Sequence, residues 1–289
     1  MKITEQKGAV VLHNADCFSP RNIFENGQAF RFSKIDKDTY EGVVHGRYLR
    51  IAQSGESVSL YPCTAEEFDA IWYRYFDFET DYAALFQCTE DERLRTAIRH
   101  GAGLRVLNQP PFETLISFIL SANNNVGRIC GIVQRLCETC GRPFSFEGKT
   151  YYAFPTPEAL AGMAEGSLRS CGCGYRAPYV THTAKMIADG FPLLELCKMD
   201  YWEAKQKLCS LPGVGPKVAD CVLLFSLGKR DAFPADVWIK RVLKNDYGFL
   251  GTDREIYSFA RKKFGPFSGI AQQYLFYYAR ESRMDDVMV

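Results

Sequence analysis

A lysine and an aspartate give the strongest chemical signal in this sequence. Lys217 follows the run Leu211-Pro-Gly-Val-Gly-Pro216, and Asp236 follows Pro234-Ala235. Proline fits the first turn of a helix, so Lys217 is expected at a helix start, where free N–H groups create a positive potential that disfavours the ammonium. An uncharged lysine is a nucleophile, and the pattern therefore predicts covalent chemistry at Lys217.

Asp236 is expected to be the N-cap of another helix. It stands between the Pro234-Ala235 turn and the apolar stretch Val237-Trp-Ile239. At that position a side-chain oxygen accepts a hydrogen bond from a free helix amide. We expect the carboxylate to stay ionised there, so that it can stabilise a nearby cation.

Two helices and a tight turn must position the lysine. Asp200-Tyr-Trp-Glu203 matches a capping box for the first helix, and the second is expected from Pro216 to about Gly228. Gly213 and Gly215 let backbone N–H groups of the turn approach a phosphate closely. The pattern predicts a helix-hairpin-helix, although the turn taken alone also fits an ordinary Pro/Gly connection.

With these motifs the chain resembles the helix-hairpin-helix DNA glycosylases, and most closely their 8-oxoguanine DNA glycosylase branch. Four further motifs stand in the expected order: Asn26-Gly-Gln-Ala-Phe-Arg31, Ser121-Ala-Asn-Asn-Asn-Val-Gly-Arg128, Cys173-Gly-Tyr-Arg-Ala177 and Gly265-Pro-Phe-Ser-Gly-Ile-Ala-Gln-Gln-Tyr-Leu-Phe276. The resemblance covers nearly the whole chain. It implies a bifunctional enzyme of base excision repair that excises 8-oxoguanine, preferably opposite cytosine, and then cleaves the abasic site.

The resemblance implies a role for each residue on the damaged strand. A base in a duplex must be flipped out before its sugar can be attacked. Lys217 would then attack C1′ and form a Schiff base that permits β-elimination, while Asp236 would stabilise the cationic sugar. The base itself would be held by four residues: Gly27, whose carbonyl accepts from the N7–H of 8-oxoguanine; Gln272, which reads the Watson–Crick edge; Phe276, which stacks; and Cys221.

From the sequence alone, purely structural roles for these base-contacting residues remain open. Positions 272 and 276 are neighbours on one helix face, so their side chains can converge on one base. Without the family match, however, Phe276 also fits a core position and Gln272 a surface position. Cys221 fits equally well as a small buried residue one turn after Lys217.

A second group of residues is assigned by the resemblance to the opposite strand. Asn123, Arg128 and Arg176 would fill the gap and read the estranged cytosine, while Tyr175 would wedge into the stack. Taken alone, Gly174 to Arg176 is also an ordinary surface turn.

No cofactor is required by the predicted chemistry, although the resemblance places a monovalent or divalent cation on the carbonyls of Cys209, Leu211 and Val214. An iron–sulfur cluster of the endonuclease III type is not expected, because no cysteine follows Cys221. A zinc site at Cys137, Cys140, Cys171 and Cys173 is the weaker alternative, since Cys137 falls within a helical pattern.

The composition is that of an ordinary globular chain. Its 289 residues are 47% hydrophobic and carry a net charge of +1, so DNA binding would need a local basic face. Basic clusters at Lys240, Arg241 and Lys244 and at Arg261-Lys-Lys263 are candidates, and they also fit solvated helix faces.

The chain lacks the roughly 18-residue apolar run of a membrane helix and the apolar stretch of a signal peptide. We therefore expect an intracellular protein, in the cytoplasm or nucleoid if the host is prokaryotic. Its eleven cysteines are expected to be reduced thiols. The expected partner is double-stranded DNA containing 8-oxoguanine, bound by a monomer.

The periodicity predicts an α+β protein. Short β-type runs at 40–44, 48–52 and 57–61 indicate an antiparallel meander, a helix runs from Thr64 to about Tyr75, and the pattern is helical almost throughout from Asp91. Further helices are expected at 112–120, at 126–140 and from Thr156. We expect a sheet domain over residues 1–90, packed on a helical domain over 91–289.

Two other functions remain to be weighed. A related glycosylase for another damaged purine, such as an alkylated base, would use the aspartate with water and lack Lys217. A non-catalytic DNA-binding module would use only the hairpin and would not need Asp236. The chain also departs from family patterns at Trp238, where many eukaryotic members have histidine, and at Phe225, where some have methionine, which bears on substrate tuning.

Overall fold

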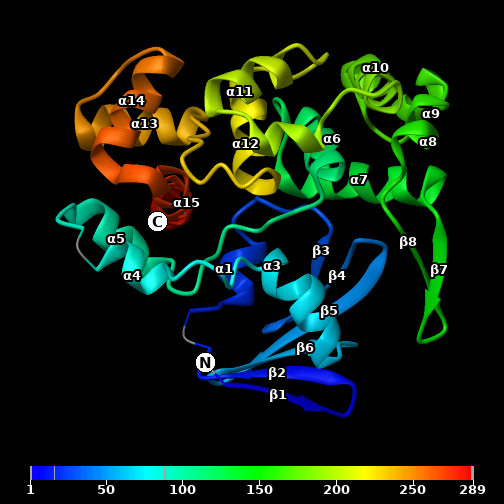
Figure 1. Ribbon diagram of the computed structural model, residues 1–289, viewed down its shortest axis with the longest axis horizontal. Coiled ribbons are helices and arrows are strands. Elements are labelled where there is room, and N and C mark those ends of the chain that lie inside the picture. The colour runs from blue at the N-terminus through cyan, green and yellow to red at the C-terminus, as the bar shows by residue number, and fades with distance from the viewer. Residues whose placement is uncertain (1, 16, 88, 288–289) are drawn as a thin grey trace.

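The computed structural model describes residues 2–15, 17–87 and 89–287. A twisted antiparallel sheet forms one side of the molecule, and a larger group of helices forms the other (Figure 1). This is the predicted α+β class. Among the described helices, none has the length and apolar character needed to cross a membrane.

The N-terminal sheet has six strands in the order β1-β2-β6-β5-β4-β3, each antiparallel to its neighbour. The strands are β1 (Lys2–Gln6), β2 (Ala9–His13), β3 (Phe32–Asp36), β4 (Thr39–Val44), β5 (Arg47–Ser54) and β6 (Ser57–Tyr61). The predicted meander is confirmed as β4 to β6. The outer strands β1 and β3 escaped prediction because they are mostly exposed and polar, so they carry no alternating apolar face.

The segment after Thr64 is helical, as predicted. The Thr64 hydroxyl accepts a hydrogen bond from the Glu67 amide, and the Glu67 carboxylate accepts one from the Thr64 amide, which makes a full capping box. The helix comprises α2 (Ala65–Glu67), a π-helical turn at Phe68–Trp72 and α3 (Tyr73–Tyr75). It buries Phe68 and Trp72 in the core under the sheet.

The C-terminal part is built from helices. They are α5 (Glu92–His100), α6 (Pro111–Ser121), α7 (Val126–Cys140), α8 (Pro157–Ala161), α9 (Glu165–Ser170), α10 (Ala177–Ala188), α11 (Tyr201–Cys209), α12 (Pro216–Ser226), α13 (Val237–Tyr247), α14 (Asp253–Phe264) and α15 (Ser268–Val287). Short helices α1 (Pro20–Phe24) and α4 (Tyr82–Phe86) precede them. The predicted helices near 112–120, at 126–140 and after Thr156 are confirmed.

A hairpin of two strands interrupts this helical part, and the prediction of an almost wholly helical region after Asp91 was wrong there. Strands β7 (Pro143–Phe146) and β8 (Lys149–Tyr152) pair antiparallel across a Glu147-Gly148 turn with positive φ at both positions. Glutamate is a rare choice for that turn, so its signal is weak. Figure 1 shows the hairpin reaching toward the N-terminal sheet, where Phe146 stacks on Tyr48 with ring centroids 4.5 Å apart.

A buried arginine ties the N-terminal segments to the connection that leads into α6. Arg105 is 2% exposed, and its guanidinium lies over the Tyr82 ring, 4.3 Å from the centroid. It donates hydrogen bonds to four backbone carbonyls, those of Cys17, Phe76, Asp77 and Thr80. Since these acceptors come from separate segments, one side chain fixes their relative positions.

We predict that Arg105→Met lowers the free energy of unfolding by about 3 kcal/mol, because it leaves several buried carbonyls without a donor. Urea unfolding measures the change. Arg21→Met is the control, since the Arg21 side chain is 64% exposed and should be nearly neutral. Equal losses in the two variants would contradict the role assigned to Arg105.

Candidate active site

The helix-hairpin-helix predicted from the sequence is formed by α11 and α12. Asp200 caps α11 by accepting from the amides of Trp202 and Glu203, and α12 begins at Pro216, as expected. Gly213 in the turn has a φ of +77°, and a Cβ there would lie 2.7 Å from the Tyr179 Cβ on α10. Both the backbone conformation and the close approach of α10 therefore require glycine.

Lys217 occupies the first turn of α12 and is half-buried. Its Nζ donates to the Ser121 Oγ at 3.3 Å and lies 5.2 Å from the centroid of the Phe118 ring. Phe118 in turn stacks on Phe225, with ring centroids 5.4 Å apart. The amine thus contacts the C-terminal end of α6 through Ser121 and lies over the ring of Phe118.

Asp236 is the N-cap of α13, as predicted, and accepts a hydrogen bond of 2.9 Å from the Ile239 amide. Burial raises the pKa of the Asp236 carboxyl, while that hydrogen bond and the Lys217 charge oppose the rise. The sequence predicted a carboxylate kept ionised by the helix start. The structure adds the opposing effect of burial, which makes protonation of this carboxyl easier.

Lys217 and Asp236 face one small cavity of about 50 Å³. Six predicted site residues line it, namely Gly27, Lys217, Cys221, Asp236, Gln272 and Phe276, together with Asn26, Phe118, Phe225, Pro234 and Gln273. A cavity of this volume is large enough to hold water.

The position of Gly27 is fixed by its neighbours in the sequence. The Asn26 Oδ1 accepts from the Gln28 amide at 3.0 Å, which folds the backbone tightly around Gly27 at a φ of +81°. The Gln28 side chain donates to the carbonyls of Ile23 and Arg105. Asn26 and Gln28 are therefore structural partners that present the Gly27 backbone to the cavity.

The structure brings Cys221, Gln272 and Phe276 to the same cavity. Burial raises the pKa of the Cys221 thiol to about 12, so it is a protonated, apolar wall near neutral pH. Gln272 is 2% exposed and donates to the Pro234 carbonyl at 3.1 Å. Phe276 lies beneath the Arg280 guanidinium, 5.7 Å from the ring centroid.

The residues assigned to the opposite strand form a separate group beside the cavity. Tyr175 is 56% exposed, and Asn123 and Arg128 are exposed at the α6–α7 connection. Arg176 differs, because it is 6% exposed and its guanidinium donates to the carbonyls of Ala122 and Asn123. It also covers the Tyr175 ring at 4.4 Å.

The cation expected on the hairpin carbonyls stays a prediction. The Leu211 carbonyl accepts from the Val214 amide at 3.1 Å, and a carbonyl oxygen has a second lone pair for a cation. Among the residues that the structure describes, no three His, Cys, Asp or Glu side chains are grouped for metal binding. The described cysteines, including Cys137, Cys171 and Cys173, are free thiols.

Three residues near the chemistry were not singled out from the sequence: Phe118, Ser121 and Gln273. Phe118 lies in an apolar helix whose period gives no hint that one ring faces a lysine. Ser121 and Gln273 stand inside family motifs but had no assigned role. Only the three-dimensional contacts of Lys217 and Gln272 identify them.

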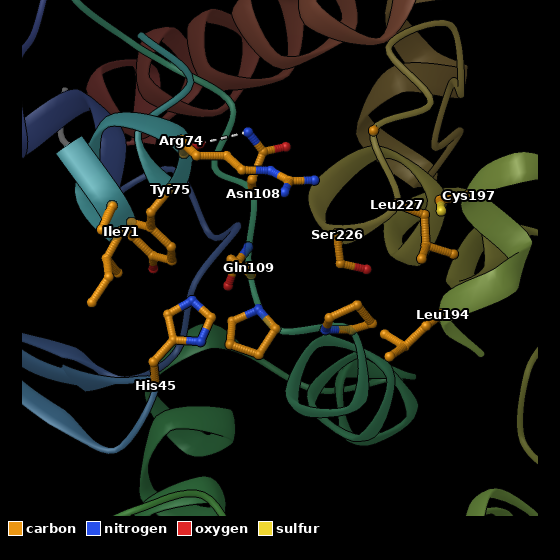
Figure 2. A pocket seen from close by; sticks show the side chains of 14 residues that line it. His45, Ile71, Arg74, Tyr75, Asn108, Gln109, Leu194, Cys197, Ser226 and Leu227 are labelled. Carbon is orange, nitrogen blue, oxygen red and sulfur yellow. Dashed lines mark hydrogen bonds between the residues drawn. The ribbon is translucent and has the colours of Figure 1, made fainter. Parts of the chain in front are cut away.

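A larger pocket of about 600 Å³ lies elsewhere, where the N-terminal part meets the helices (Figure 2). Figure 2 shows His45 and Tyr75 on one side of it and Leu194 and Leu227 on the other. Its lining includes none of the predicted site residues. The size of a pocket alone therefore does not identify the candidate active site.

Comparison with known families and proteins agrees with the motifs. A model described as the N-terminal domain of 8-oxoguanine DNA glycosylase matches residues 10–115, and one described as the HhH-GPD superfamily base excision DNA repair protein matches residues 116–266. Together they span most of the chain. The resemblance predicted from the sequence is confirmed.

Individual proteins show the same likeness. The probable N-glycosylase/DNA lyase of Methanothermobacter thermautotrophicus is 38% identical over 232 residues, which is 73% of this chain and 74% of that protein. The N-glycosylase/DNA lyase of Saccharomyces cerevisiae is 42% identical over 50% of this chain and 42% of its own length. The 8-oxoguanine glycosylase/lyase of Clostridium acetobutylicum, solved with double-stranded DNA containing cytosine opposite 8-oxoG, superposes with a TM-score of 0.93 at 38% identity, covering 98% of this chain and 99% of that one.

We predict that Gly213→Ala lowers the free energy of unfolding by about 2 kcal/mol or more, because it combines a strained φ with a clash against Tyr179. Gly215→Ala is the matched control, since a Cβ there meets nothing within 4 Å. It should cost less than about 1 kcal/mol. Urea unfolding compares the two, and a Gly213 variant as stable as the Gly215 variant would refute the packing argument.

Proposed function

The chain belongs to the family of 8-oxoguanine DNA glycosylases, and from that membership we propose how its own residues excise 8-oxoguanine and cleave the abasic site. The family places it in DNA repair as a glycosylase and lyase that acts on double-stranded DNA. The observation that best supports this mechanism is that Lys217 and Asp236 lie at the starts of two helices and face one cavity.

Lys217 is the proposed nucleophile. Its uncharged Nζ forms a bond to C1′ as the glycosidic bond breaks, and the electron pair leaves with the base, which takes up a proton. Opening of the sugar ring then gives an imine between Nζ and C1′. Loss of a proton from C2′ allows the C3′–O bond to break, which releases the 3′ phosphate by β-elimination. Water finally hydrolyses the imine.

Asp236 has two proposed tasks. Its carboxylate stabilises the positive charge that develops on the sugar, which a preorganised group does well in a cavity with little water. Because burial raises its pKa, it also exchanges protons with the reacting groups more readily than an exposed aspartate. The Ile239 amide holds it in position for both tasks.

Base recognition is proposed to use the backbone of Gly27 and the side chains of Gln272 and Phe276. The N7–H of 8-oxoguanine would donate to the Gly27 carbonyl, whereas unmodified guanine presents a lone pair there. Gln272 would read the Watson–Crick edge and Phe276 would stack on the ring. Cys221 would close the wall next to Lys217.

The DNA duplex is proposed to be held on both sides of the flipped nucleotide. Amides near Gly213 and Gly215 would bind a phosphate, supported by a cation on the carbonyls of Cys209, Leu211 and Val214. In the division of labour that we propose, residues 1–90 form the sheet domain and residues 91–289 carry catalysis.

Cytosine preference is proposed to arise at the α6–α7 connection. Arg128 is exposed at the start of α7 and is free to donate to the acceptors of an unpaired cytosine. Arg176 acts on the same base by holding the Asn123 carbonyl, so that Asn123 keeps its position. Tyr175 fills the stack beside it.

We predict that Lys217→Gln abolishes both base excision and strand cleavage on duplexes with 8-oxoguanine but leaves binding largely intact. Glutamine keeps most of the bulk of the side chain but cannot form an imine. Lys37→Gln serves as the control, because Lys37 is exposed in the turn between β3 and β4. Excision that persists in the Lys217 variant would overturn the mechanism.

We predict that Arg128→Ala reduces discrimination for cytosine by about 1–3 kcal/mol, the usual worth of a good contact to a base edge. Excision rates opposite each of the four bases measure it. Arg176→Ala should weaken the cytosine preference indirectly and also lower stability, because the carbonyls of Ala122 and Asn123 lose its guanidinium as a donor. A uniform loss in the Arg128 variant would show that Arg128 contacts phosphate.

A further inference from the structure

A second cavity of about 530 Å³ lies where the turn between β4 and β5 meets the start of α6 and the end of α7. Of its lining residues in the described part of the chain, none also lines the cavity of Lys217. It adjoins the pocket in Figure 2, because His45 and Pro110 line both. Its volume lies in the range of roughly 300–1,000 Å³ that is usual for small-molecule sites.

The walls of this cavity are mostly apolar and include two aromatic rings. Phe112 from α6 and Phe154 from the segment after β8 meet edge to face, with ring centroids 6.0 Å apart. Pro155 and Ala159 add further apolar surface. Burial raises the pKa of the Cys140 thiol to about 11, so this lining residue is also uncharged near neutral pH. Such walls suit a planar aromatic molecule.

One carboxyl group, that of Glu113, is buried in the same wall. Glu113 is 9% exposed, and no hydrogen bond or ion pair to its carboxyl is found among the described residues. Burial raises its pKa to about 7, and the charge of Arg31 opposes the rise only in part. His45 and Arg142 also line the cavity, but both are exposed, so solvent screens them.

Arg31 does not satisfy this carboxyl by direct contact. Its Nη2 donates to the Tyr152 carbonyl at 2.5 Å, and its buried Nη1 has no hydrogen-bond partner in the described part of the chain. A carboxylate removed from water without a donor costs free energy, and folded proteins keep few such groups. In a cavity of this size, a donor supplied by a ligand accounts for its retention.

We propose that this cavity is a second ligand site, in which the Glu113 carboxylate accepts two hydrogen bonds from adjacent N–H groups on one edge of a small aromatic aminoheterocycle or aryl amidine. The two oxygens of a carboxylate accept such a pair side by side. An acidic ligand would be repelled by Glu113, and a hydrocarbon would leave it unpaired. The inference goes beyond the proposed function, because it involves neither the flipped base nor Lys217.

Helix α6 separates this site from the catalytic cavity. Glu113 lies in the first turn of α6, and Ser121, which accepts a hydrogen bond from Lys217, is its last residue. At a rise of 1.5 Å per residue, the two positions are about 12 Å apart along the helix. A ligand at Glu113 therefore does not touch the reacting sugar, and its binding can be measured without DNA.

The experiment measures binding of 2-aminobenzimidazole to the whole protein by calorimetry. Its ring N–H and amino group are adjacent donors on one edge. The comparison ligand is 2-methylbenzimidazole, which keeps the ring and replaces the amino group by a methyl group. The wild-type protein should bind 2-aminobenzimidazole at least about tenfold more tightly, as expected for one hydrogen bond to a charged group.

Glu113→Gln keeps the size of the side chain but replaces one acceptor oxygen by a donor. It should weaken binding of 2-aminobenzimidazole at least about tenfold and abolish the preference over the methyl compound. Its melting temperature should stay equal or rise, because a buried amide costs less than an unpaired carboxylate. Glu66→Gln is the matched control, since Glu66 is exposed on α2 and lies outside the cavity lining.

A further variant, Ala159→Leu, fills the cavity from α8 and leaves Glu113 unchanged. It should also abolish binding of 2-aminobenzimidazole. This variant shows whether the ligand occupies this cavity or the one at Lys217, which Ala159 does not line.

Loss of binding in Glu113→Gln and Ala159→Leu, with wild-type binding in Glu66→Gln, would support the site. A wild-type protein that binds neither compound, or both equally, would overturn it. Unchanged binding in Glu113→Gln or Ala159→Leu would place the ligand elsewhere and overturn it as well. If Glu113→Gln does not fold, Ala159→Leu decides alone.

Discussion

An amine and a carboxylate are placed at two helix starts that face one small cavity, and the rest of the structure depends on this constraint. Lys217 needs surroundings with little water, and Asp236 needs amides that hold its carboxyl without neutralising it. The hairpin turn, with Gly213 packed against Tyr179, sets where α12 begins. The Pro234 turn does the same for α13.

The contacts of the α6 terminus link the two sides of the proposed DNA site. Ser121 accepts a hydrogen bond from Lys217, and the next residue, Ala122, accepts one from Arg176. The segment that contacts Lys217 is thus continuous with the one that carries Asn123, the proposed contact to the opposite strand. If a partner base other than cytosine displaced this segment, the contact between Ser121 and Lys217 would change as well.

Local sequence patterns predicted much of the fold and the candidate site. Pro216, Asp200 and Asp236 predicted helix starts because capping is decided by neighbouring residues, and three alternating runs predicted β4 to β6. Strands β1, β2, β3, β7 and β8 were not predicted. The outer strands β1 and β3 are mostly exposed and polar, and the Glu147-Gly148 turn gives only a weak signal for the β7–β8 hairpin. The burial of Arg176 and the contact between Gln272 and Gln273 depend on packing between elements, which no local pattern encodes.

The most direct test of the central claim is to map the covalent intermediate. The protein is incubated with a duplex containing 8-oxoguanine opposite cytosine in the presence of borohydride, and the reduced adduct is digested and sequenced by mass spectrometry. The account predicts a sugar remnant attached to Lys217. An adduct on any other amine, or excision of the base with no adduct, would contradict it.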